Sequence, residues 1–212
     1  MIRSDRRTWT LATGLALLAG YVDAIGFQHL GGYFVSFMSG NGTMLAVRLA
    51  SSHGRTGWGG VGILAGLLAL FVLGVLLGTL IRLFLARAGQ AAVLLFVAVL
   101  LGGVALWGNW TAPAMVVAMG AINATFERNG EVSIGVTYMT GTLVKLGQHL
   151  AHMIAGRRRW DWVPYLLLWT GFLVGAALGA LIFPRWGTDA LLAAAVAALV
   201  AAGITWHRRP TV

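Results

Sequence analysis

Apolar residues run through the chain in eight stretches that short polar segments separate. The stretches cover about residues 8–27, 31–50, 58–85, 90–107, 110–126, 131–153, 162–183 and 188–206. A helix needs about 20 mainly apolar residues to cross the hydrocarbon core of a bilayer, and most of the stretches approach that length. The pattern therefore predicts an all-α polytopic membrane protein.

Two of the stretches, 31–50 and 131–153, are less apolar than the others. Each begins with alternating or aromatic residues and then passes a small polar step into a helix-like run. The step is Ser39-Gly40-Asn41 in the first stretch and Thr140-Gly141-Thr142 in the second. Ser, Thr and Asn are good helix N-caps. We expect an extended stretch, a glycine break, and then a helix that starts inside the membrane.

Parts of the sequence occur twice. Gly40 and Gly141 lie 101 residues apart (141 − 40), and the same offset relates FVLGVLLGTLI at 71–81 to FLVGAALGALI at 172–182. Two motifs in one register predict two homologous halves, 1–108 and 109–212, within a single membrane domain. Duplicated halves are typical of transporters, whose sites lie where the halves meet.

The number of membrane crossings depends on how the two less apolar stretches run through the membrane. Non-helical backbone at membrane depth is tolerated only where protein or a water-filled cavity surrounds it. If each stretch enters and leaves on one side, each half has three crossings and the halves are inverted. If each crosses fully, there are eight spans and the halves are parallel. We favour about six transmembrane helices with two broken or re-entrant segments, which is an inverted repeat.

Composition supports a membrane location. The chain is 58% hydrophobic and 10% charged, with a mean hydropathy of +0.82, whereas soluble domains average about 25% charged residues. The net charge is +9, and the basic residues flank apolar stretches. The expected partner is therefore the lipid bilayer and not nucleic acid, and either topology places both termini in the cytoplasm. The chain contains no cysteine, which excludes thiol chemistry.

Asp23 lies deep in the first apolar stretch. An ionisable side chain at that depth costs about 2.5–3.5 kcal/mol on insertion scales, so it is a functional candidate by default. Asn123 is its counterpart at an offset of 100 residues. Asp23 could couple transport to a proton or cation, while Asn123 hydrogen-bonds neutrally. The alternative is that Asp23 caps the chain after Phe27 or reaches the interface.

The two small polar steps are candidates for solute binding. Helix N-termini carry partial positive charge and free N–H donors, which suit an anion or carboxylate. The candidate residues are Ser39, Gly40, Asn41, Thr140, Gly141 and Thr142, with Phe37, Tyr138 and Lys145 as further members. The alternative is that these small residues only permit packing and cap the break.

The remaining basic, glycine, histidine and acidic motifs are expected to serve mainly structural roles. Arg48 is expected to reach the interface, and Lys145 either does so, attracts an anion or pairs with Asp23. The glycine pairs Gly74/Gly78 and Gly175/Gly179 predict close packing between the halves or between protomers of a homodimer. His149 and His152 read as interfacial residues, and Glu127 and Glu131 as a solvated turn. No metal site, cofactor or enzyme active site is expected.

These motifs also resemble a known family. Residues 20–27, 32–41, 120–124 and 138–142 are similar to signatures of the YoaK-like bacterial integral membrane family, domain of unknown function 1275. The resemblance covers nearly the whole chain and implies a multi-pass protein of the bacterial inner (plasma) membrane with about six spans. It implies no substrate. This chain has Gly42 where the resemblance leads us to expect threonine.

The leading hypothesis is a small secondary transporter of a small, possibly anionic solute that binds between the two helix breaks. A passive channel would use the same breaks to line a pore. A non-transporting membrane scaffold would use its glycine stripes to bind a partner span. Saturable, gradient-coupled flux separates the transporter from the channel. The scaffold predicts no pocket between the two less apolar stretches and loss of assembly in Gly78→Leu.

Overall fold

The computed structural model describes residues 6–51, 58–85, 88–108, 111–128, 131–157 and 160–207, and these are almost entirely helical. The elements are α1 (Arg6–His29), α2 (Met38–Ser51), α3 (Trp58–Phe84), α4 (Gly89–Trp107), α5 (Thr111–Ala121), η1 (Ile122–Phe126), β1 (Glu127–Arg128), β2 (Glu131–Val132), α6 (Met139–Ile154), α7 (Val163–Trp186), η2 (Gly187–Ala190) and α8 (Leu191–His207). The all-α prediction is confirmed apart from the short antiparallel ladder of β1 and β2.

The helices follow the apolar stretches closely. The stretch 110–126 forms α5 and then tightens into the 3-10 turn η1, and the stretch 188–206 forms η2 and α8. The two less apolar stretches contain the short helices α2 and α6, each preceded by non-helical chain. We call residues 30–37 the first linker and residues 133–138 the second linker.

Four helical stretches within the described residues are long and apolar enough to cross a membrane. They are Arg6–His29, Gly59–Phe84, Gly89–Trp107 and Val163–His207. The last contains 45 residues, which as one helix would be more than twice the ~30 Å hydrocarbon core. It is divided into α7 and α8 at Gly187, whose φ is 52°. The predicted count of six crossings stays a prediction.

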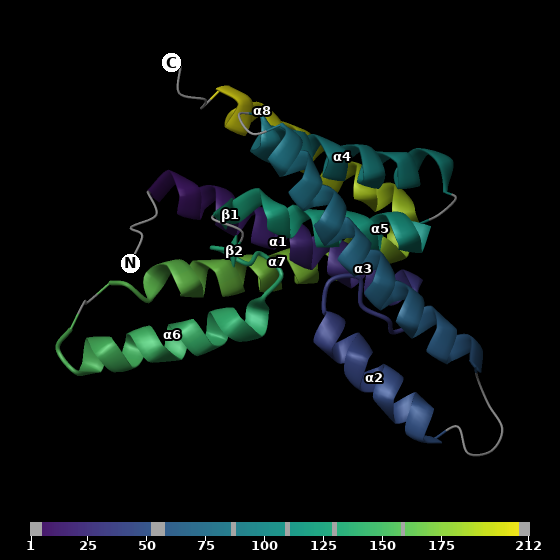
Figure 1. The fold of residues 1–212 in the computed structure, drawn as a ribbon, viewed down its shortest axis with the longest axis horizontal. Helices are drawn as coiled ribbons and strands as arrows, with labels where there is room; N and C mark the ends of the chain where they lie inside the picture. The colour runs from purple at the N-terminus through teal and green to yellow at the C-terminus, as the bar shows by residue number, and fades with distance from the viewer. Residues whose placement is uncertain are drawn as a thin grey trace.

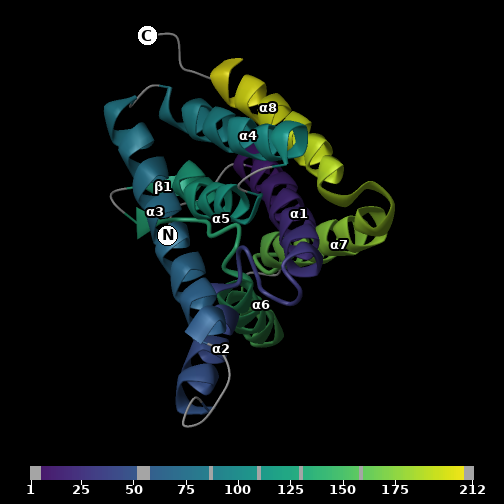
Figure 2. The same ribbon diagram turned by 90° about the vertical axis from the view of Figure 1, so that its right-hand side faces the viewer.

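Three long helix pairs build the body of the molecule: α1 with α7, α3 with α5, and α4 with α8. Figures 1 and 2 show α4 and α8 side by side on one side of the molecule, with α1 and α5 next to them. Every one of these pairs joins a helix before residue 108 to a helix after it. The packing therefore interleaves the two predicted halves.

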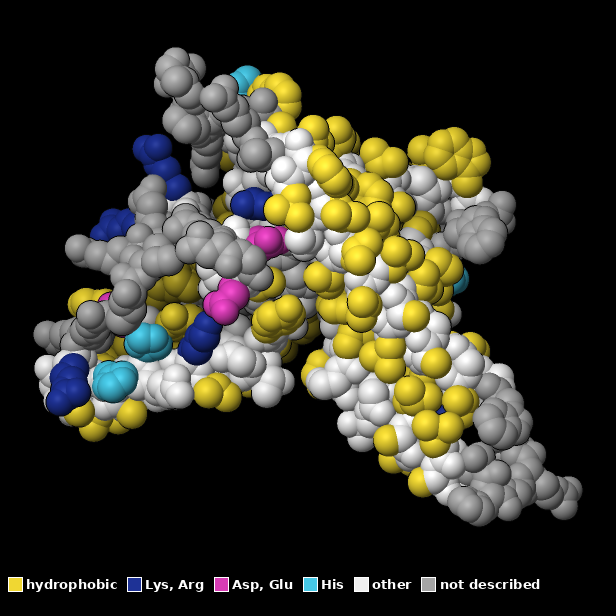
Figure 3. Space-filling model, in the orientation of Figure 1, with side chains coloured by type: hydrophobic (Ala, Val, Ile, Leu, Met, Phe, Trp, Pro, Cys, Tyr) yellow, Lys and Arg dark blue, Asp and Glu magenta, His cyan; other side chains and the backbone are white. Residues whose placement is uncertain are grey.

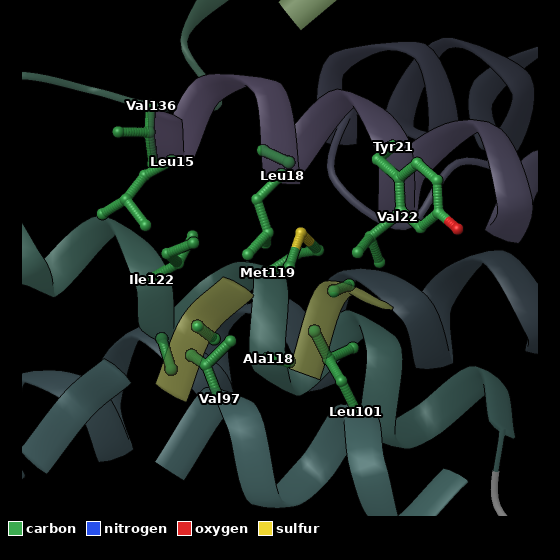
Figure 4. Packing of buried hydrophobic residues seen from close by; sticks show 14 of the residues in the cluster. Leu15, Leu18, Tyr21, Val22, Val97, Leu101, Ala118, Met119, Ile122 and Val136 are labelled. Atoms are coloured by element: carbon green, nitrogen blue, oxygen red, sulfur yellow. The ribbon is translucent and has the colours of Figure 1, made fainter. Parts of the chain in front are cut away.

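The core lies where α1, α4, α5 and α8 meet. Figure 4 shows Leu15 and Leu18 of α1 directed toward Met119 of α5 and Ile122 of η1, with Leu101 of α4 on the far side. These five side chains are no more than 3% exposed.

Glycines allow the helix pairs to approach closely. A Cβ on Gly175 would overlap the carbonyl oxygen of Leu17, and one on Gly74 would overlap that of Val117. Gly179 and Gly78 lie one turn further along and are equally close to backbone of the partner helix. The prediction that these glycines serve packing is confirmed, and their partners are α1 for α7 and α5 for α3.

The short helices α2 and α6 lie outside this body. Helix α2 packs on α3 and α6 packs on α7. Figure 1 shows that both begin near the middle of the molecule, from where α2 runs to the lower right and α6 to the left. Each buries only one of its own residues, Asn41 in α2 and Thr142 in α6.

The visible surface separates apolar and basic side chains. In Figure 3 hydrophobic side chains cover the upper centre and right of the molecule, whereas Lys and Arg side chains gather on the left. Helix α1 begins and α8 ends on that left-hand side in Figure 1. Broad exposed apolar faces are what a bilayer would cover, and basic residues concentrate where a chain meets the cytoplasmic surface.

Candidate functional site

The helices α2 and α6 start earlier than their glycine steps. The first hydrogen bonds of α-helical spacing run from Asn41 N–H to Phe37 O (3.3 Å) and from Thr142 N–H to Tyr138 O (2.9 Å). Gly40 and Gly141 are therefore helical, and the predicted glycine break is wrong in position. The change from linker to helix occurs three residues earlier, at Phe37 and Tyr138.

The predicted N-caps are also wrong. Asn41 instead reaches back to the first linker, where its Oδ1 accepts from Phe34 N–H (3.1 Å) and its Nδ2 donates to Phe34 O (2.7 Å). The side chain thus satisfies both backbone groups of Phe34 and is 0% exposed. Thr142 donates to Tyr138 O (3.1 Å), and the residue at the N-cap position of α6, Tyr138, makes no side-chain capping bond.

Asp23 holds the first linker to α1. Its Oδ1 accepts hydrogen bonds from Val35 N–H (3.0 Å) and Ser36 N–H (2.7 Å), and the residue is 6% exposed. Buried backbone donors without acceptors cost free energy, so the carboxyl group stabilises a linker that has no secondary structure of its own. These contacts agree with the alternative interpretation, in which Asp23 caps the chain after Phe27.

Asn123 holds the second linker in the corresponding way. Its Oδ1 accepts from Thr137 Oγ1 (2.9 Å), while its Nδ2 donates to Met119 O (2.9 Å). Thr137 is the counterpart of Ser36 at the offset of 101 residues. Asn123 and Thr137 are 0% and 8% exposed. The first linker is thus held by the Asp23 carboxyl group, which accepts from backbone N–H groups. The second linker is held by the Asn123 amide, which accepts from the Thr137 hydroxyl group.

The accessible members of the predicted site lie on the first turns of α2 and α6. Ser39, Thr140 and Gly141 are exposed, and the rings of Phe37 and Tyr138 are 41% and 49% exposed. Gly40 is half-buried, because a Cβ there would meet the rings of Phe37 and Phe34. The structure therefore divides the predicted residues into buried ones that hold the linkers and accessible ones beside them.

The two basic candidates lie over aromatic rings. Lys145 is exposed, with its Nζ 6.0 Å from the ring centre of Tyr165 on α7. The guanidinium carbon of Arg48 lies 5.2 Å from the ring centre of Tyr33 in the first linker. Lys145 thus contacts α7, and the proposed pairing with Asp23 is not what the structure shows.

His149 stacks on Tyr165 from α6. The ring centres of His149 and Tyr165 are 4.9 Å apart, and the angle between the ring planes is 12°. Trp9 of α1 packs edge-on against the same Tyr165 ring. His152 lies 6.3 Å from His149 between ring centres. In the part of the chain that the structure describes, no three His, Cys, Asp or Glu side chains are grouped so that they could hold a metal ion.

A polar junction that was not predicted from the sequence lies at the end of η1. Arg82 of α3 donates to Thr125 O and Glu127 O, both at 3.0 Å, and Gln90 of α4 donates to Thr125 O at 3.3 Å. Thr79 donates to Glu127 Oε2 at 3.1 Å. Glu127 is therefore a half-buried structural residue, and its assignment to a solvated turn is wrong. The sequence feature that could have indicated this junction is Arg82, a cation near the end of the long apolar stretch 58–85.

These features define a class of protein: a polytopic helical membrane protein in which buried polar side chains hold two irregular linkers beside two short helices. Comparison of sequences gives the family. Residues 11–204 match the family described as a protein of unknown function, DUF1275, and the chain belongs to that family. The family resemblance inferred from the motifs is confirmed.

A curated relative agrees with this assignment. The chain is 36% identical over 193 residues to UPF0700 transmembrane protein RA0705 of Rhizobium meliloti (strain 1021), which covers 90% of this chain and 82% of that protein. No solved structure matches the chain. The membrane location thus rests on the relative and on the apolar helices together.

Proposed function

We propose that this membrane protein is a small secondary transporter that binds a small, anionic solute beside the first turns of α2 and α6. One observation carries the proposal: two irregular linkers inside an apolar helical body are each held by a buried polar side chain and each lead into a short helix. Broken helices that start in the membrane interior are the usual binding elements of secondary transporters.

Reciprocal packing supports a two-fold repeat of residues 1–108 and 109–212, which is one element of the proposed inverted repeat. Gly20 of α1 meets Phe172 O of α7, and Gly120 of α5 meets Phe71 O of α3. Gly120 is the counterpart of Gly20 at an offset of 100 residues, and Phe172 is the counterpart of Phe71 at an offset of 101 residues. The two contacts therefore join corresponding residues. A two-fold relation makes each contact occur twice in this way, with the roles of the halves exchanged.

The directions of the short helices support six crossings. In Figure 1 α2 and α6 leave the middle of the molecule toward opposite edges, and α3 and α7 return from those edges across the whole body. The proposed crossings are α1, α3, α4, α5 with η1, α7 and α8. The basic side in Figure 3 then faces the cytoplasm of a bacterial inner membrane, together with both termini.

The proposed solute site uses first-turn backbone. The N–H groups at the start of a helix have no acceptor within it and carry its partial positive charge. In α2 these groups precede Asn41, the first residue to bond back to Phe37. Ser39, Thr140 and Gly141 add accessible small polar surface, and the rings of Phe37 and Tyr138 border it.

Asp23 would couple proton movement to the first linker. Gain of a proton weakens a carboxyl oxygen as an acceptor, so the bonds from Val35 and Ser36 would loosen. The linker leads directly into α2, and its release would alter the first turn where the solute binds. Asn123 has no such proton to exchange, and the second linker would stay fixed. Alternating access would then arise from one half moving against the other.

The test is transport by purified protein in proteoliposomes with an imposed pH gradient. The probes are a panel of small carboxylates, phosphate and sulfate, and uptake is followed together with internal pH. We expect saturable uptake of at least one anion that depends on the gradient. Asp23→Asn should abolish the gradient dependence, because the amide keeps an acceptor for the linker but cannot exchange a proton.

Glu131→Gln is the matched control, because it changes an exposed acid to its amide in the same chain. Full gradient-driven uptake by Asp23→Asn would disprove the coupling role. Non-saturating flux that ignores the gradient would favour the passive channel. In the scaffold hypothesis a partner span binds glycine stripes, whereas Gly74, Gly78, Gly175 and Gly179 each face backbone of another helix of this chain.

A further inference from the structure

Two pockets lie next to each other at one end of α1. The first is apolar, with a volume of about 350 Å³, and lies between α1 and α8. The second is more polar, with a volume of about 510 Å³, and lies where α1, α4, η1 and α8 meet. Arg7 and Leu11 line both pockets. The two pockets therefore adjoin at these two residues, and we call the pair the α1–α8 hollow.

The apolar pocket is a groove that runs along α1. Its lining extends from Arg7 to Leu18 on α1 and from Ala197 to Ile204 on α8. Eleven residue steps of helix rise about 16 Å, which is close to half of the ~30 Å hydrocarbon core. The groove therefore has the length of one leaflet. Gly14 borders it, and a Cβ there would meet no atom within 4 Å, so the groove is open beside this residue.

The polar pocket lies at the basic end of that groove. It is lined by Arg7, Thr8, Leu11, Gln90, Phe126, Thr205 and His207. No acidic side chain lines either pocket among the described residues. Thr205 Oγ1 already donates to Ala201 O, and Gln90 Nε2 donates to Thr125 O. Arg7, which faces no carboxylate among the described lining residues, is therefore the group that suits a phosphate.

We propose that this hollow binds one anionic phospholipid of the inner leaflet, with an acyl chain along the α1–α8 groove and the phosphate beside Arg7. Three properties support the lipid over a free anion. The groove is apolar and about one leaflet long, the polar pocket adjoins it at Arg7 and Leu11, and Arg7 carries a positive charge. Each volume falls within the range of about 300–1,000 Å³ that is usual for small-ligand sites. The site is separate from the linkers and does not depend on the proposed transport activity.

The test is native mass spectrometry of the purified full-length protein. The probes are phosphatidylglycerol, phosphatidylethanolamine of the same acyl chains, and soluble glycerol 3-phosphate. We expect one phosphatidylglycerol to stay bound preferentially. Arg7→Gln should weaken its binding about fivefold, the usual contribution of one basic residue near a membrane surface. Gly14→Leu should abolish it, because the new side chain would occupy the groove.

Gly203→Leu is the matched control. Gly203 is exposed on α8, lines neither pocket, and has no atom within 4 Å of a Cβ position. Unchanged binding by Gly203→Leu together with loss in Gly14→Leu would support the site. Equal retention of the two lipids, or full phosphatidylglycerol binding by Gly14→Leu, would overturn it. Binding of glycerol 3-phosphate that survives Gly14→Leu would overturn the lipid in favour of a free-anion site.

Discussion

At the scale of residues, the protein places polar side chains where backbone would otherwise lack partners. Asp23 accepts from two linker N–H groups, and Asn41 satisfies both backbone groups of Phe34. Irregular backbone inside a membrane must find its hydrogen bonds within the protein, because no water is available. The first linker thus exists because buried polar side chains replace the bonds of a helix or sheet.

The contribution of Asp23 to stability can be measured directly. Asp23→Ala removes the acceptor of two N–H donors, those of Val35 and Ser36. A buried donor left without a partner costs about 1–3 kcal/mol, so we expect the loss of both bonds to lower stability by about 2–6 kcal/mol. Asp23→Asn should retain most of the stability. The measurement is the apparent melting temperature in detergent, with Glu131→Ala as an exposed acidic control. Equal stability of Asp23→Ala and wild type would show that the linker does not depend on these bonds.

At the scale of elements, glycine determines which helices pair. Helices α3 and α7 carry the motifs at 71–81 and 172–182, and both present glycine to the backbone of a partner helix. Association of helices in lipid depends on van der Waals packing and close approach, because lipid tails are as apolar as the side chains. Small residues at four-residue spacing therefore determine the pairs α3–α5 and α7–α1.

Two alanine substitutions on α3 should differ in their effect on stability. A Cβ at Gly74 would overlap Val117 O, whereas a Cβ at Gly66 would meet no atom within 4 Å. We expect Gly74→Ala to lower stability by about 1–3 kcal/mol, the usual cost of overpacking. Gly66→Ala should leave stability unchanged or raise it by up to about 1 kcal/mol, because alanine favours helix. Thermal unfolding of both variants in the same detergent tests this difference, and a similar response of the two would contradict it.

At the scale of the whole molecule, the helices of one half are paired with helices of the other. The pairs α1–α7, α3–α5 and α4–α8 all cross residue 108. Neither half therefore has a complete core of its own. In the proposed inverted repeat, the two short helices would open toward opposite faces of the membrane, which is the geometry that alternating access requires.

The orientation of the short helices can be tested with single cysteines, because the sequence contains none. Ser51 ends α2, and Ile154, which is 82% exposed, ends α6. We expect a membrane-impermeant maleimide to label Ser51→Cys from outside and Ile154→Cys only from the cytoplasmic side. Trp107→Cys and His207→Cys mark the two faces in the same topology. Labelling of Ser51 and Ile154 from one side would reject the inverted arrangement.

Much of the fold could be predicted from local sequence. The boundaries of α3, α4 and α7 lie within a few residues of the apolar stretches, because a membrane helix needs only a run of apolar side chains. Much less of the candidate site could be predicted. Capping preferences placed the N-caps at Ser39 or Asn41 and at Thr140 or Thr142, with the helices after them. Asn41 and Thr142 instead bond to backbone before the helix. The bonding partner of a polar side chain depends on the path of the chain, which capping preferences do not specify.

Composition and short-range pattern predict a membrane protein of apolar helices, two irregular linkers, packing glycines and a buried acid paired by position with an amide. The folded structure was needed to show that α1 packs on α7 and α5 on α3, that Asp23 accepts from Val35 and Ser36, and that Arg82 and Glu127 meet at the end of η1. The reason is that these contacts join segments distant in sequence, and each depends on how closely whole helices approach.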